Sequence, residues 1–128
     1  MSLRSPLGVA LGSGTAGEGV DHWWSQRVSA LALVPLTIWL LVSLVRVPLA
    51  DYAAVTIWMG SDWNPVWLAL TLLAGCWHSR LGAQVVIEDY LHGPGVKLAA
   101  LLCNSAAHLL LAASGLYAIL RVALRGMP

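Results

Sequence analysis

Charged residues are scarce in this chain, and no run of basic residues occurs. Of the 128 residues, 10% are charged and 59% are hydrophobic, whereas soluble globular domains carry about 25% charged residues. The mean hydropathy is +0.75. The shortage of charge argues against a soluble domain, because the lipid bilayer is the simplest environment for long apolar stretches. The lack of a basic run argues against nucleic acid as a partner.

The sequence also lacks the motifs of a self-sufficient active site. It has no nucleophile with a neighbouring base, no phosphate-binding loop and no closely spaced group of metal ligands. Its two cysteines, Cys76 and Cys103, do not form a CxxC pair and fall inside apolar segments. We interpret both as small core residues. The chain alone is therefore predicted to be non-catalytic.

The long apolar stretches predict an all-α integral membrane protein with three transmembrane helices. Residues 1–20 are rich in Gly and Ser and lack the apolar core of a signal peptide, so we expect a flexible tail. Residues 21–128 are predicted to form a single transmembrane domain. Its spans are expected at about residues 28–48, 65–87 and 96–124, since each approaches the roughly 20 residues needed to cross a bilayer.

Polar residues inside a span are costly and by default suggest function. His78 lies in the second span, on a helix face with Thr71, Gly75, Gly82 and Asp89. Small residues beside a histidine leave space for a flat, wide group such as haem, with the imidazole as axial ligand. The alternative is close helix packing in which His78 is hydrogen-bonded to a neighbouring helix.

The other polar residues also allow two interpretations each. Arg80 could pair with a haem propionate or extend towards the lipid headgroups. Asp89 and Tyr90, at the end of the second span, suit a quinone headgroup, or they are simply interfacial residues. His108 in the third span could be a second axial ligand, or a structural histidine that donates to a backbone carbonyl.

The segment from His78 to Tyr90 carries a recognisable pattern: a histidine, Gly82 four residues later, and then Asp89 followed by Tyr90. The segment 22–30, with two tryptophans and Arg27 just before the first span, adds to it. The pattern resembles the succinate dehydrogenase hydrophobic membrane anchor, D subunit, over roughly residues 20–124. The chain lacks the His-Arg-x-Thr-Gly signature of the C subunit of that family, which favours the D subunit.

The resemblance implies a place in an electron-transfer complex of the respiratory chain and tricarboxylic acid cycle. In this family the D subunit pairs with a second anchor, the C subunit, in one helical bundle. Together they hold the iron–sulfur and flavoprotein subunits on the membrane, and electrons pass from succinate to ubiquinone. The membrane would be the bacterial cytoplasmic membrane or the mitochondrial inner membrane.

The resemblance also implies roles for particular residues. His78 would bind the iron of a haem b shared with the C subunit, as one of two axial ligands. Tyr90, supported by Asp89, would bind ubiquinone. Arg27 would approach the quinone or a haem propionate.

Two other functions are compatible with the residues. A self-contained small b-type cytochrome would bind one haem through His78 and His108. A homo-oligomeric transporter subunit would line a polar path with His78, Arg80 and Asn104.

Overall fold

The computed structural model describes residues 16–125, and all regular structure in this range is helical. The predicted tail falls mostly on residues 1–15, which lie outside the described residues. The helices are, in chain order, α2 (Ala16–Arg46), α3 (Tyr52–Gly60), α4 (Asn64–Tyr90) and α5 (Pro94–Arg125).

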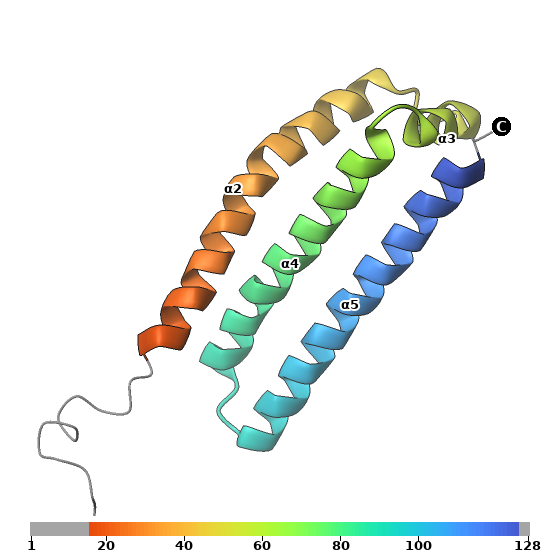
Figure 1. Cartoon of the computed structure of the whole chain (residues 1–128). Coiled ribbons are helices and arrows are strands. Elements are labelled where there is room, and N and C mark those ends of the chain that lie inside the picture. The colour runs from red at the N-terminus through yellow and green to blue at the C-terminus, as the bar shows by residue number, and fades with distance from the viewer. Residues whose placement is uncertain (1–15, 126–128) are drawn as a thin grey trace, which may run out of the picture.

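The three long helices lie side by side in a single row, with α4 in the middle (Figure 1). The short helix α3 packs across one end of the row, against α4 and α5. Within residues 16–125, the Cα atoms of α2 and α5 all lie more than 8 Å apart. Because the row is only one helix thick, each outer helix packs mainly against α4, and α3 adds a second link between them at one end.

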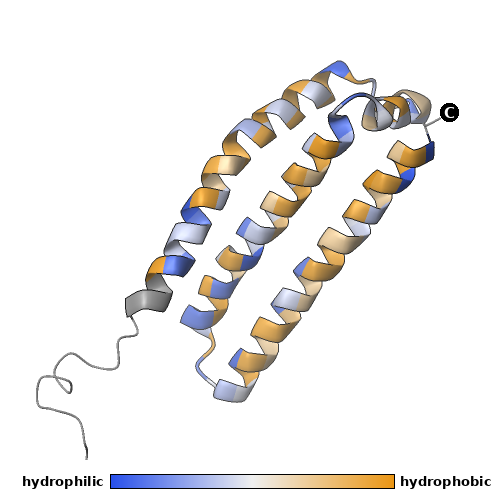
Figure 2. Ribbon diagram, viewed as in Figure 1, coloured by the Kyte–Doolittle hydropathy of each residue, from blue (hydrophilic) through white to orange (hydrophobic). Residues whose placement is uncertain are grey.

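Few side chains are buried in this layer. Its buried hydrophobic residues are Leu36, Cys76, Leu81 and Ile119. Hydrophobic residues follow most of the length of α2, α4 and α5 (Figure 2), and many of them are exposed, such as Leu31 at 75% and Leu109 at 71%. A hydrophobic surface of this extent requires lipid or partner chains around it.

Two of the helices are long and apolar enough to cross a membrane: Val20–Arg46, within α2, and Pro94–Arg125, which is α5. They contain most of the predicted first and third spans. The predicted second span falls within α4, which is 27 residues long but carries several polar and charged residues in its second half. By composition alone, α4 is therefore less clearly a membrane span than its neighbours.

The helix ends follow from local chemistry. Proline lacks the backbone N–H that the first turn of a helix leaves unused, so both Pro65 and Pro94 occur where a helix begins. The α4 helix continues to Tyr90, three residues beyond the predicted end of the span. It stops just before residues 91–93, which connect it to α5.

The sequence analysis did not foresee α3. Asp51 caps its first turn, because the carboxylate accepts hydrogen bonds from the backbone N–H groups of Ala53 and Ala54 at 2.9 and 3.3 Å. The indole of Trp39 on α2 lies between those of Trp58 on α3 and Trp67 on α4, with ring centroids 6.2 and 5.8 Å away. This aromatic cluster joins three helices at one end of the row.

Helix α5 packs tightly against α4 at Gly115. A Cβ atom at this position would lie 2.5 Å from Cδ2 of Leu72, whereas a Cβ atom at Gly75 would meet nothing within 4 Å.

We expect Gly115→Val to lower the free energy of unfolding by about 1–3 kcal/mol, the usual effect of overpacking. Gly75→Val is the matched control and should change it little. Unfolding of the purified chain in mixed micelles with increasing SDS measures both; equal losses would contradict this packing.

Candidate functional site

His78 on α4 faces α2. Its Nδ1 lies 3.1 Å from Oγ of Ser29, and Ser29 is only 8% exposed. One turn further along α4, a Cβ atom at Gly82 would lie 3.7 Å from Nε2 of Gln26. Small residues such as Ser29, Ala30 and Gly82 allow the two helices to approach closely. The interpretation of His78 as hydrogen-bonded to a neighbouring helix therefore holds for one of its two ring nitrogens.

A cavity of about 360 Å³ adjoins His78 between α2 and α4, lined by Trp23, Gln26, Arg27, Ala30 and His78. Cζ of Arg27 lies 5.3 Å from the ring centroid of Trp23, so the guanidinium is held over an indole face. No acidic side chain lines this cavity. Its one charged side chain is a cation next to an imidazole, which suits a ligand with an anionic group.

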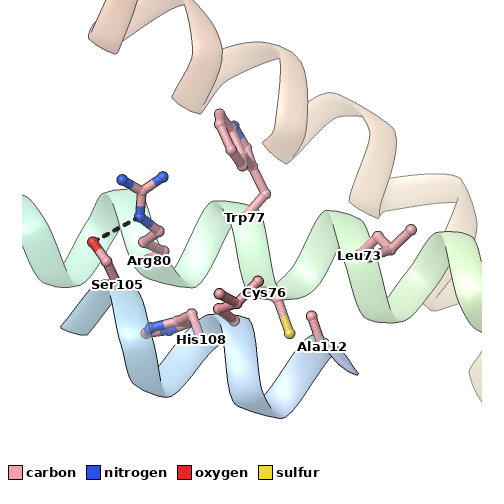
Figure 3. Close-up of a pocket in the computed structure, with 8 residues that line it drawn as sticks. Leu73, Cys76, Trp77, Arg80, Ser105, His108 and Ala112 are labelled. Carbon is pink, nitrogen blue, oxygen red and sulfur yellow. Dashed lines mark hydrogen bonds between the residues drawn. The ribbon is translucent and has the colours of Figure 1, made fainter. Parts of the chain in front are cut away.

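Arg80 lies elsewhere, between α4 and α5 (Figure 3). Its Nε donates to Oγ of Ser105 at 3.2 Å, and its Cζ lies 5.5 Å from the ring centroid of Trp77. Arg80 lines a second cavity, of about 330 Å³, whose other lining residues are Leu73, Cys76, Trp77, Ser105, His108, Leu109 and Ala112. The structure thus brings Arg27, and not Arg80, into the cavity of His78.

Both ring nitrogens of His108 are engaged. Nδ1 lies 2.8 Å from the carbonyl oxygen of Asn104, and Nε2 lies 3.1 Å from Oγ of Ser79. A carbonyl oxygen only accepts, so Nδ1 carries the proton and Nε2 accepts from the Ser79 hydroxyl. Asn104 in turn donates from Nδ2 to the carbonyl oxygen of Arg80 at 3.0 Å. These bonds fasten α5 to α4 and leave His108 no free nitrogen for a metal.

This arrangement separates the residues that the two alternative functions require. His78 lies against α2, whereas His108 packs on α4 from the side of α5. One haem cannot take both as axial ligands in this packing. The polar path of a transporter is also interrupted, since His78 and Arg80 line different cavities and the amide of Asn104 bonds to backbone.

Asp89 and Tyr90 end α4 and lie at the surface, with Tyr90 77% exposed. Neither lines one of the cavities described above. The neighbouring turn is fixed by Lys97, whose Nζ donates to the carbonyl oxygen of Glu88 at 3.1 Å. A quinone site at this end would therefore need walls from another chain.

Two residues of this region were missed as site residues from sequence. From the sequence, both Ser29 and His22 stand out only as members of the segment 22–30. Nε2 of His22 is buried without a hydrogen-bond partner in the described part of the chain, although buried polar atoms are normally paired. Their spacing could have identified them from the sequence. Helical intervals of four and three residues place His22, Gln26 and Ser29 on one face of α2.

Comparisons with known proteins agree with the sequence resemblance. A profile of the family described as succinate dehydrogenase/fumarate reductase transmembrane subunit matches residues 1–113. The succinate dehydrogenase hydrophobic membrane anchor subunit of Paracoccus denitrificans is 29% identical over 97% of this chain and 95% of its own length. The same subunit of Rickettsia bellii is 29% identical over 94% and 88%, respectively. The succinate dehydrogenase membrane anchor subunit of Reclinomonas americana is 32% identical over 63% and 70%.

Proposed function

Because the chain belongs to the succinate dehydrogenase/fumarate reductase transmembrane subunit family, we propose that it is the D-type anchor of a succinate:quinone oxidoreductase. In this role it is an integral membrane subunit without a reaction of its own. It pairs with a second anchor subunit and holds the iron–sulfur and flavoprotein subunits at the membrane. It helps to bind a haem b and ubiquinone.

The haem part of this proposal rests on Nε2 of His78. Nδ1 is bonded to Ser29, whereas Nε2 has no hydrogen bond to the side chains and backbone that the structure describes, and His78 lines the cavity. No group of three or more potential metal-binding side chains gathers in these residues, so a metal at His78 needs its other ligands from elsewhere. A porphyrin supplies its own equatorial ligands, and the partner anchor would supply the second axial histidine.

The surroundings of His78 fit the same group. The cation of Arg27 could pair with a propionate, and Arg80, on the other side of α4, is less suited to this. Gly75 lies one turn before His78, and a Cβ atom at this position would meet nothing within 4 Å. When bound, the haem would accept and release single electrons; the chain itself would hold the iron ligand and the counter-charge.

We also propose that α4 crosses the membrane as the second of three spans, between α2 and α5, in a bundle completed by the partner anchor. Its polar second half suits an environment shielded from lipid, because intramembrane polar groups face the interior of a bundle. The uncovered faces of the single helical layer provide surface for such a partner. On the same assumption, the surface-exposed Tyr90 and Asp89 face the iron–sulfur subunit, where the phenol donates to a quinone carbonyl and the carboxylate orients the phenol.

Replacing each histidine in turn distinguishes a shared haem from a haem held by this chain alone. We expect His78→Ala in the assembled complex to abolish the low-spin b-type spectrum, because the axial ligand is lost. His108→Ala is the matched control and should retain that spectrum, since His108 only fastens α5 to α4. Reduced-minus-oxidised spectra of the purified complexes measure this. A normal spectrum in His78→Ala would show that another residue binds the iron.

Removing the hydroxyl group of Tyr90 tests its assignment to the quinone site. Tyr90→Phe should lower kcat/KM for quinone reduction about 5- to 30-fold, the equivalent of about 1–2 kcal/mol for one hydrogen bond. Succinate oxidation by an artificial dye should not change. Tyr52→Phe is the control, because Tyr52 is similarly exposed, at 80%, and begins α3, which lies across the opposite end of the row (Figure 1). Unchanged quinone kinetics in Tyr90→Phe would remove Tyr90 from the site.

A further inference from the structure

Ser29 is the one buried polar side chain among the described residues. Its hydroxyl has two neighbours: the carbonyl oxygen of Gln26 at 3.0 Å and Nδ1 of His78 at 3.1 Å. A hydroxyl carries a single hydrogen and two lone pairs. Which of these two neighbours receives the hydroxyl hydrogen determines which nitrogen of His78 is protonated.

Only one arrangement turns both contacts into hydrogen bonds. The carbonyl oxygen of Gln26 can only accept, so it must receive the Ser29 hydrogen. The Ser29 oxygen then accepts from Nδ1 of His78, and Nδ1 must carry the ring proton. If the hydroxyl instead donated to Nδ1, the contact with Gln26 would be lost, leaving one bond where two are possible. The burial of Ser29 raises the cost of a lost bond, since water cannot replace it.

The consequence falls on the other nitrogen. A neutral imidazole with its proton on Nδ1 has a bare lone pair on Nε2, which is the form that binds a metal. We infer that Ser29 is a positioning residue that holds His78 in the Nδ1-protonated tautomer and fixes the direction of Nε2. This inference rests on the proposed role of His78 as the haem ligand. It assigns to α2 a part in tuning the haem through the ligand on α4.

The hydrogen bond to Nδ1 also affects the strength of the ligand. Donation from a ligating histidine through its second ring nitrogen raises the basicity of the ligand, and its loss typically lowers metal affinity by about 10- to 100-fold. A more basic ligand favours ferric over ferrous iron. Losing the Ser29 hydroxyl should therefore raise the midpoint potential of the haem and weaken its retention.

Substitutions at position 29 test this in the complete complex. We expect Ser29→Ala to raise the haem midpoint potential, shift the EPR g-values of the ferric haem and speed haem transfer to apomyoglobin about tenfold or more. Ser29→Thr keeps the hydroxyl and should return all three towards the wild-type values. Thr37→Val is the matched control, because Thr37 on the same helix bonds only to backbone carbonyls of its own turn, and it should match the wild type.

Two results would overturn the inference: potentials and EPR spectra of Ser29→Ala identical to those of the wild type, or Ser29→Thr shifted as far as Ser29→Ala. A wild-type complex without haem would instead contradict the proposed function. In that case, ¹⁵N NMR of histidine-labelled full chain in nanodiscs tests Ser29 directly, with His78 assigned through His78→Gln. Nδ1 protonation that is lost in Ser29→Ala would support the inference, and Nε2 protonation in the unmodified chain would refute it.

Discussion

The polar side chains in the second half of α4 need hydrogen-bond partners that lipid cannot provide, and the rest of the fold is arranged around this need. The helix α2 supplies Ser29 to His78. The helix α5 supplies Ser105 to Arg80 and Asn104 to the backbone of α4. Since the Cα atoms of α2 and α5 stay more than 8 Å apart within residues 16–125, these bonds and the small residues beside them account for the order of the row, with α4 in its centre.

The two sides of α4 differ in what they leave available. On the side of α5, His108 has both nitrogens occupied and Arg80 is bonded to Ser105. On the side of α2, His78 keeps one nitrogen free beside Arg27. The first side is built for helix packing, whereas the second combines one metal-binding atom with one cation, in a cavity whose lining holds no acidic side chain. This asymmetry supports a cofactor completed by another chain over a cofactor bound within this one.

Much of this could be predicted from the sequence, because hydropathy fixes where long helices lie and the His78-to-Tyr90 segment carries a family pattern. The short helix α3 was missed since its nine residues lie in the connection between the first two predicted spans, although Asp51 before an apolar run is a capping signal. The different surroundings of Arg27 and Arg80 could not be predicted, because they depend on which neighbour each face of α4 meets. The same holds for Ser29, whose importance comes from a contact across 49 residues of sequence.

The most direct test of the account is to isolate the native complex through this chain, count its subunits on a gel and record its reduced-minus-oxidised visible spectrum. The account predicts three further subunits, one of them bearing flavin, and a b-type α-band from a haem shared between the two anchors. A colourless preparation that contains only this chain would contradict it.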